Sequence, residues 1–162
     1  MKKIFLSTAL FLLGMTAFCQ QEENGTIYIK HAYIDVVNNA TKAYLTNDDA
    51  ANKMIYSDTA KWWISGMDNF IPIADAMKMW GNDFKYFDDI KSVQVGYPDY
   101  LHYKKGDMMI VQSWWVWSGK SMKTGEVIKV PEVLFDEFNK DGKIVREYIY
   151  GDFSKVTKEE GM

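Results

Sequence analysis

Cysteine is almost missing from this chain of 162 residues, since Cys19 is the only one. A lone cysteine excludes an internal disulfide and a metal site built from cysteines. Histidine is scarce as well: the chain has only His31 and His102, and neither has a second histidine at the spacing of a metal-binding pair. We therefore expect no metal site and no cofactor, and a fold stabilised by its hydrophobic core.

Long apolar runs are also missing, apart from one at the N-terminus. Residues 4–15 are almost wholly apolar and follow Lys2 and Lys3. The run is shorter than the about 20 residues that a membrane-spanning helix needs, so we expect no stable membrane span. A basic start, a short apolar stretch and small residues after it are typical of a secretory signal peptide, which we place at residues 1–19.

Two fates are open for the end of this leader. Cleavage before Gln20 puts Ala17 and Cys19 at the −3 and −1 positions and releases the protein into the periplasm or the medium. The alternative is a lipid anchor on Cys19, which Phe18 disfavours because a small residue usually precedes a lipidated cysteine. We favour export with release, followed by a flexible polar segment at residues 20–26.

An excess of positive charge is absent too. The chain has 19 basic against 22 acidic residues, and loss of the leader makes the balance more acidic. Such a balance gives no support to binding of nucleic acid or of an anionic membrane surface. The length beyond the leader fits one domain of ordinary size.

Helical periodicity dominates the first half of the chain. One helix is expected from Thr26, capped by Thr26 or Asn24, with an apolar face that recurs at Ile29, Tyr33, Val36, Ala40 and Tyr44. A short second helix follows Asp48 or Asp49. A third is expected from Pro72, with a one-sided stripe at Ile73, Met77, Trp80, Phe84 and Phe87.

Strand patterns dominate the second half. A first strand lies earlier, at residues 58–64. The later strands are predicted at residues 92–97, 100–104, 108–118, 126–138 and 143–152, with a hairpin turn at 139–142. Pro131 marks a bend, bulge or edge position in its strand, and residues 154–162 are expected to form a charged, frayed tail.

Tryptophan is concentrated in the segment Ser113–Gly119, which reads SWWVWSG. In a strand, Trp115 and Trp117 face one side and Trp114 the other. Both faces then need apolar cover, and one of them is expected to line the core or a pocket.

Helices followed by long strands predict an α+β fold, a cone-shaped roll of about three N-terminal helices on a curved, mostly antiparallel sheet. The order of elements, with YSDTAKWWIS after the helical pair and FDEFNKDGKIVREYIYGDF as the last hairpin, resembles the nuclear-transport-factor-2-like (NTF2-like) superfamily and its SnoaL-like branch. The resemblance covers residues 27–153, and its motifs are soft patterns of turns and apolar positions. It implies a cone that holds a small molecule and a homodimer formed through the sheet.

The resemblance also implies acid–base chemistry as one possible activity, because the superfamily includes isomerases, dehydratases and epoxide hydrolases. In the ketosteroid-isomerase branch the base is a carboxylate soon after a turn that corresponds here to Ser57–Ala60. The residues that follow that turn are Lys61-Trp62-Trp63-Ile64, so this base is not carried over.

Carboxylates on the long strands and near the helices remain as candidates for catalysis: Asp58, Asp83, Glu132, Asp136 and Glu147. Glu132 is of most interest, although a bend at Pro131 favours turning it outward to solvent, because buried unpaired carboxylates are costly. His102 is a weaker candidate because histidine titrates near neutral pH.

Aromatic residues provide the best functional indication, and the predicted ligand-contacting set is Tyr33, Trp62, Trp80, Trp115, Trp117 and Tyr148. Our first hypothesis is an exported domain that binds a small apolar or amphipathic molecule without assignable catalysis. The second is a cofactor-free acid–base enzyme using the same pocket, and the third a protein-interaction module with a filled cone. A buried carboxylate in an open cavity would favour the enzyme.

Overall fold

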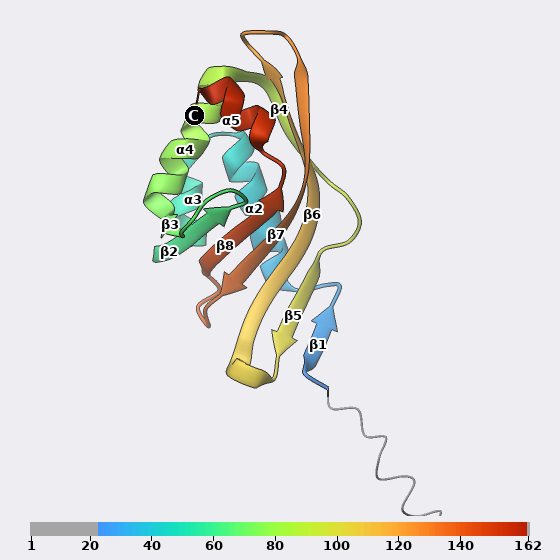
Figure 1. The fold of residues 1–162 in the computed structure, drawn as a ribbon. Helices are drawn as coiled ribbons and strands as arrows, with labels where there is room; N and C mark the ends of the chain where they lie inside the picture. Colours follow the sequence, from blue (N-terminus) through green and yellow to red (C-terminus); the bar gives the residue numbers. More distant parts are fainter. Residues whose placement is uncertain (1–22, 162) are drawn as a thin grey trace, which may run out of the picture.

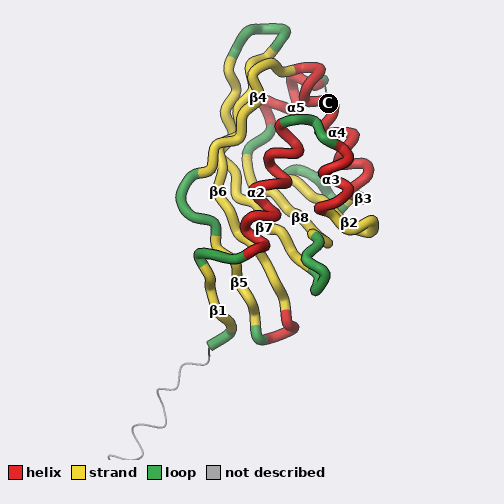
Figure 2. Tube along the Cα trace, turned by 180° about the vertical axis from the view of Figure 1, so that it is seen from behind, coloured by secondary structure: helices red, strands yellow, loops and turns green. Residues whose placement is uncertain are grey.

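A computed structural model describes residues 23–161, so the predicted signal peptide and the start of the polar segment lie outside the described residues. Within that range the helices α2–α5 pack on a sheet of eight strands in the order β1-β5-β6-β7-β8-β2-β3, with β4 also paired to β6 (Figures 1 and 2). Every strand pair is antiparallel except β2 with β8. The predicted α+β class is confirmed.

The elements have the following bounds. The helices are α2 (Ala32–Leu45), α3 (Asp49–Ile55), α4 (Ile73–Tyr86) and α5 (Ser154–Glu160), with a short 3-10 turn at Lys105–Asp107. The strands are β1 (Gly25–Tyr28), β2 (Tyr56–Ile64), β3 (Ile71–Pro72), β4 (Phe87–Gln94), β5 (Asp99–Tyr103), β6 (Met108–Ser121), β7 (Val127–Phe138) and β8 (Ile144–Gly151).

The start of the first helix is predicted wrongly. Residues 25–28 form β1, which pairs with β5 at the sheet edge, so residues 25 and 26 are also not a flexible segment. At Gly25 an added Cβ would lie 2.3 Å from the His102 carbonyl oxygen, so only glycine allows this close backbone approach. The helix begins at Ala32, where His31 Nδ1 accepts a hydrogen bond from the Tyr33 N–H at 3.2 Å and caps the first turn.

The second and third helices follow their predictions closely. Asp48 caps α3 through a 2.9 Å hydrogen bond from the Ala51 N–H. Helix α4 begins directly after Pro72, and its apolar stripe packs toward the sheet from Ile73 onward. Phe87, the last residue of that stripe, ends the helix and begins β4, where it is buried.

The long strands β6, β7 and β8 form the centre of the sheet and separate two faces. On β6 the odd-numbered residues from Val111 to Ser121 are buried toward the helices, while Trp114 and Val116 lie half-buried on the other face. The period of two along a strand accounts for this division. Helix α2 lies behind the sheet in Figure 1 and in front of it in Figure 2, so the inner, helix-covered face is the one seen in Figure 2.

The predicted frayed tail is a further difference. Residues 154–160 form helix α5, which lies beside α4 and the top of β4 (Figure 1). Its Val156 is buried in an apolar cluster with Phe87, Trp117 and Val130. Tertiary contacts therefore hold a segment whose own sequence is mostly charged.

Candidate active site

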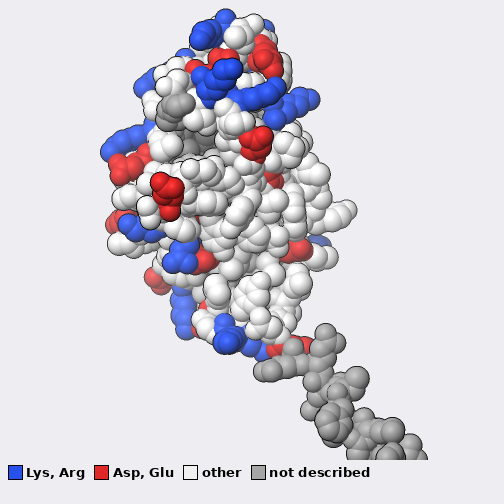
Figure 3. Space-filling model, in the orientation of Figure 1, with Lys and Arg blue, Asp and Glu red and all other residues white. Residues whose placement is uncertain are grey.

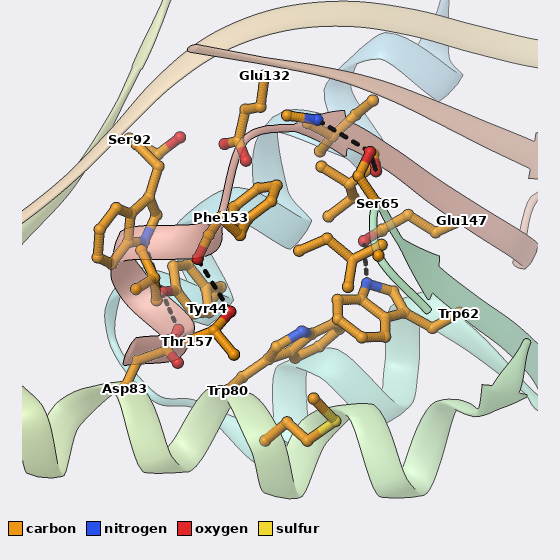
Figure 4. A pocket seen from close by; sticks show the side chains of 18 of the residues that line it. Tyr44, Trp62, Ser65, Trp80, Asp83, Ser92, Glu132, Glu147, Phe153 and Thr157 are labelled. Atoms are coloured by element: carbon orange, nitrogen blue, oxygen red, sulfur yellow. Dashed lines mark hydrogen bonds between the residues drawn. The ribbon is translucent and has the colours of Figure 1, made fainter. Parts of the chain in front are cut away.

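A cavity of about 960 Å³ lies between the inner face of the sheet and the helices. Its wall combines residues of α2, β2, α4, β6, β7, β8 and α5, which come from both ends of the described chain. Figure 4 shows α4 along one side of the cavity and the strand that carries Glu132 on the opposite side. The volume is in the range of ordinary small-molecule sites.

Glu132 points into this cavity from β7 (Figure 4). The prediction that the Pro131 bend turns it outward is wrong, because β7 stays in register with β6 through the pairs Val116–Pro131 and Trp115–Glu132. The Glu132 side chain therefore points to the same inner face of the sheet as the side chains of Val130 and Leu134. Burial, followed by the charges of Glu147 and Asp83, raises its pKa to about 8.

No N–H or O–H group in residues 23–161 donates a hydrogen bond to the Glu132 carboxyl. The group is thus largely buried, faces open space and is near half-protonated slightly above neutral pH. These three properties are the ones that a general acid or base requires.

A second carboxyl group, Glu147 on β8, lies deeper in the cavity wall. Its Oε1 accepts a hydrogen bond from Trp62 Nε1 at 3.0 Å, and its Oε2 accepts one from the Tyr56 hydroxyl. The Asp136 carboxyl on the neighbouring strand is also hydrogen-bonded to it, and burial raises the pKa of both acids. Asp136 is 1% exposed, and the charge of Glu147 beside it raises its pKa further, so Asp136 holds the shared proton.

A third group connects α4 to α2 and α5. The Trp117 Nε1–H donates to the Tyr44 hydroxyl at 2.8 Å, and that hydroxyl donates to Asp83 Oδ2 at 2.5 Å. Asp83 is hydrogen-bonded in turn to the Glu160 carboxyl. Burial raises the pKa of Asp83 to about 8 and also raises that of Glu160, so this pair shares a proton at neutral pH as well.

Three of the six predicted ligand-contacting aromatics line the cavity: Trp62, Trp80 and Trp117. Trp80 stands at the centre of an aromatic cluster, with ring centroids 5.8 Å from Tyr56, 6.1 Å from Trp62 and 6.2 Å from Tyr44. The phenol rings of Tyr44 and Tyr56 complete this side of the wall.

The other three predicted aromatics lie elsewhere. Tyr33 stacks on Phe138 at 4.4 Å outside the cavity wall, and Trp115 is buried with its Nε1–H donated to Ser113 Oγ at 2.8 Å. Tyr148 lies on the outer face of the sheet, because β8 places it out of phase with Glu147. None of the three is part of the cavity wall.

Two predicted catalytic candidates also lie outside the cavity. His102, on the edge strand β5, is half-exposed, and its Nε2 lies 2.8 Å from Asp107 Oδ1. Asp58 is exposed and borders a separate, smaller depression beside α3 and α4. Neither residue is placed where it could act on a molecule bound near Glu132.

Several groups of the site were not anticipated as members of it. Tyr44 was read only as part of a helical apolar stripe and Tyr56 only as part of the segment YSDTAKWWIS. Phe153, Thr157 and Glu160 belong to or precede the helix that the sequence does not predict. Asp136 and Glu147 were candidates, but only the pairing of β7 with β8 shows that they are neighbours. The alternation of β7 was the available signal for Glu132, since Ile128, Val130 and Leu134 share its phase.

The outer face of the sheet carries a second aromatic group. Phe135 stacks on Tyr148 at 5.2 Å, and Trp63 lies 5.2 Å from Tyr150, which is 50% exposed. Trp114 lies farther along the same face. Figure 3 shows a broad area without charged side chains on this side of the molecule.

Two further observations limit the classes of site within residues 23–161. No group of three or more histidine, cysteine, aspartate or glutamate side chains in that range is arranged to hold a metal ion. In the same range, no helix is long and apolar enough to cross a membrane.

Comparison with known proteins identifies the fold. No protein-family model and no curated protein sequence matches the chain. Among solved structures it is similar to IdmH of Streptomyces antibioticus, with a TM-score of 0.60 and 14% identity over 82% of this chain and all of the other. An NTF2-like superfamily protein of Salmonella enterica serovar Typhimurium gives a TM-score of 0.61 and 14% identity, covering 76% of this chain and 90% of its own.

A protein from Catenulispora acidiphila with a ketosteroid-isomerase-like fold, solved in complex with trimethylamine, gives a TM-score of 0.59 at 14% identity, covering 79% of this chain and 93% of the other. These similarities define the class: the chain has the NTF2-like fold that its sequence predicts. At this level of identity they establish the fold and leave the reaction to the residues of the cavity.

Proposed function

We propose that this protein is a cofactor-free acid–base enzyme that binds a small, largely apolar molecule in the cavity and transfers a proton through Glu132. The observation that carries the proposal is the position of Glu132, whose carboxyl faces an aromatic-lined cavity without a hydrogen-bond donor from residues 23–161. The alternative of a purely binding domain accounts for the cavity and the aromatics, and gives no role to this carboxyl.

The arrangement around Glu132 suits proton abstraction from a carbon or hydroxyl group of the substrate. Trp62, Trp80 and Phe153 offer apolar contact area that excludes water from the reacting atoms. The neutral acids of the two carboxyl pairs keep most negative charge out of the wall, so the ionised Glu132 is a strong base when substrate displaces water. Small-molecule chemistry also agrees with the neighbours of this fold, since IdmH is described as a candidate polyketide cyclase.

A hydrogen–deuterium exchange assay tests the reaction class without knowledge of the natural substrate. Cyclic and aryl ketones are incubated with the protein in D2O, and loss of the α-proton signal is followed by NMR. We expect the wild type to accelerate exchange for members of the panel and Glu132→Gln to lower that rate by about 10²-fold or more, as loss of a general base does. The rate should rise with pH and level off above about 8, because the base form of Glu132 exists above its pKa.

The matched control is Glu126→Gln, which changes an exposed carboxylate near the β6–β7 turn that pairs with Lys155. It should exchange ketone protons at the wild-type rate. Equal rates for wild type and Glu132→Gln, or no acceleration by the wild type for any ketone, would contradict acid–base catalysis by Glu132.

Export and dimerisation complete the proposal. We propose that the mature chain begins at Gln20 outside the cytoplasm and forms a homodimer through the aromatic outer face that contains Trp63, Phe135 and Tyr148. Supporting observations are the leader-like composition of residues 1–19 and the area without charged side chains in Figure 3, beside which the outer face carries the Arg146–Glu137 ion pair.

A further inference from the structure

The cavity wall has a strong imbalance of charged groups. Four largely or fully buried carboxyl groups from three elements line it, Asp83, Glu132, Asp136 and Glu147, together with the half-buried Glu160 on α5. Among the described residues of the wall, Lys158 on α5 is the one basic side chain, and it is exposed to solvent. Buried carboxylates in proteins are normally paired with a cation, so this wall lacks the usual compensating charge.

The two carboxyl pairs show how the imbalance is tolerated in the unliganded protein. Asp136 with Glu147, and Asp83 with Glu160, each share a proton across a carboxyl–carboxyl hydrogen bond. Glu132 has no such partner and lies between the two pairs, whose charges act on it from β8 and α4. A positive charge placed beside Glu132 would therefore be attracted by the ionised member of each pair and by Glu132 once it has lost its proton.

Glu132 provides a second indication that a donor is missing from the wall. Its carboxyl faces the cavity and receives no hydrogen bond from any N–H or O–H group of residues 23–161. A largely buried acceptor without a partner is uncommon in folded proteins and calls for a partner outside the chain. A ligand that carries N–H groups can supply one from the cavity.

Aromatic rings supply the other half of a cation site. The indole rings of Trp62, Trp80 and Trp117 and the phenol rings of Tyr44 and Tyr56 line the same space. The faces of such rings carry partial negative charge and attract ammonium groups within about 6 Å, which is how aromatic cages bind quaternary amines. Apolar rings also suit the hydrocarbon part of an organic cation and do not suit a hydrated metal ion.

We propose that the molecule bound in this cavity is an organic cation, an apolar ring or chain system with a protonated or quaternary amine that lies between Glu132 and the aromatic rings around Trp80. The inference rests on the proposed function and names its substrate class. It predicts that anionic molecules are excluded, because the wall offers them carboxyl groups and no buried base.

Binding of such a cation should depend on pH through Glu132. The titratable or charged groups around it come from every neighbouring element, namely Tyr44 on α2, Tyr56 on β2, Asp83 on α4, Asp136 on its own strand, Glu147 on β8, Asp152 before α5, and Lys158 and Glu160 on α5. The cation favours the ionised form of Glu132, so its binding releases a proton whenever Glu132 is protonated beforehand. Affinity therefore rises with pH up to about 8, approaching tenfold for each pH step of one where a full proton is released.

Three fluorescent probes of nearly the same shape test the proposal: 10-methylacridinium, its uncharged carbon isostere 9-methylanthracene, and the anion anthracene-9-carboxylate. Each is titrated with the purified chain at pH 6, 7 and 8. We expect 10-methylacridinium to bind at least tenfold more tightly than 9-methylanthracene at pH 8, and anthracene-9-carboxylate to bind most weakly. Glu132→Gln should remove most of the preference for the cation and its pH dependence, while Glu126→Gln should retain both.

The outcomes separate this inference from the proposed function. Equal or tighter binding of 9-methylanthracene or of the carboxylate overturns the organic-cation assignment, and the ketone-exchange assay still decides catalysis independently. Absence of binding by all three probes also overturns the inference. Circular dichroism shows whether Glu132→Gln folds. If it does not, the organic-cation assignment is still tested in the wild type by the ratio of the affinities for 10-methylacridinium and 9-methylanthracene, and by the change of this ratio with pH.

Discussion

Among the individual residues, Glu132 is the most informative about function. Its side chain is largely buried, its carboxyl faces the cavity, and burial raises its pKa to about 8. Strand geometry alone sets its direction: Val130, Glu132 and Leu134 share one face of β7. Sequence reasoning placed Glu132 first among the carboxylates and then gave too much weight to Pro131. Proline occupies an outward, exposed position of β7 without a break in register, so no bend follows.

A stability measurement tests the electrostatic position of Glu132. Its pKa in the folded protein, about 8, lies above its ordinary value of 4.5, so the folded state binds the proton more tightly. The contribution of Glu132 to the free energy of unfolding is therefore largest below pH 4.5 and is lost as the pH rises from there through 8. Glu132→Gln cannot ionise, and we expect it to be more stable than the wild type at pH 9, by on the order of 3 kcal/mol.

The measurement is thermal unfolding at pH 5 and pH 9, with Glu126→Gln as the control. At pH 5 the melting temperatures of wild type and Glu132→Gln should nearly coincide, and at pH 9 that of Glu132→Gln should be several degrees higher. If Glu132→Gln melts at a lower temperature than the wild type at pH 9, then Glu132 is ionised and its carboxylate is stabilised by hydrogen bonds in the unliganded protein.

At the scale of elements, helix α5 is the feature with most influence on the cavity. It contributes Val156, Thr157, Lys158 and Glu160 to the wall, and Glu160 joins it to Asp83 on α4. This contact depends on a shared proton. Burial raises the pKa of Asp83 to about 8, so above that pH Asp83 loses its proton and its negative charge repels that of the Glu160 carboxylate.

Hydrogen exchange of the α5 amides should reveal this loosening. After correction for the intrinsic rate, we expect exchange of residues 156–160 to become about tenfold faster between pH 7 and pH 9, equivalent to ~1.4 kcal/mol of lost protection. In Glu160→Gln the pH step should disappear, because a neutral amide cannot repel Asp83. Glu159→Gln keeps an acceptor for the Ser121 hydroxyl and should behave as the wild type does.

If the amide exchange of residues 156–160 in Glu160→Gln also becomes about tenfold faster between pH 7 and pH 9, another titrating group causes the loss of protection. In that case the Asp83–Glu160 contact does not determine how firmly α5 is held on the cavity.

The elements also show what the sequence can and cannot predict. Helix α4 was predicted well because Ile73, Met77 and Trp80 repeat at helical spacing and face the core. Helix α5 has one buried residue, Val156, in seven, so its sequence carries no stripe and only the contacts with the rest of the fold stabilise it. β1 was missed because Ile29, directly after it, stands at helical spacing from Tyr33 and Val36, although Ile29 is exposed.

The cavity itself was beyond prediction for a related reason. Its carboxyl groups are spread from Asp83 to Glu160, and their neighbourhood follows from strand pairing and helix docking that no local pattern specifies. The resemblance to NTF2-like proteins supplied the expectation of a cone, and the tryptophan-rich strand supplied part of its wall. Which carboxyl faces the cone could be decided only by register.

On the scale of the whole molecule, the sheet has one face covered by helices and one face uncovered. The uncovered face carries Trp63, Phe135, Tyr148 and Tyr150 in mutual contact. Burying such a surface in a symmetric dimer is a common solution, since aromatic residues contribute strongly to interfaces. We therefore expect native mass spectrometry of residues 20–162 to show a dimer.

A charge placed on this face should separate the subunits. Tyr150→Lys puts an ammonium group into the expected interface and should raise the dimer dissociation constant by about 10²-fold, the effect of losing a central aromatic contact. Tyr97→Lys, which changes an 83% exposed tyrosine in the loop before β5, is the control and should remain dimeric. A wild-type chain that remains monomeric at high concentration would refute the dimer.

The distribution of the six tryptophans has a practical optical consequence. Trp62, Trp80 and Trp117 line the cavity, whereas Trp63 and Trp114 lie on the opposite side of the sheet. A quencher small enough to enter the cavity and one too large to enter it would therefore extinguish different parts of the emission. Ligand entry and subunit association could then be followed separately by intrinsic tryptophan fluorescence, with no label attached to the chain.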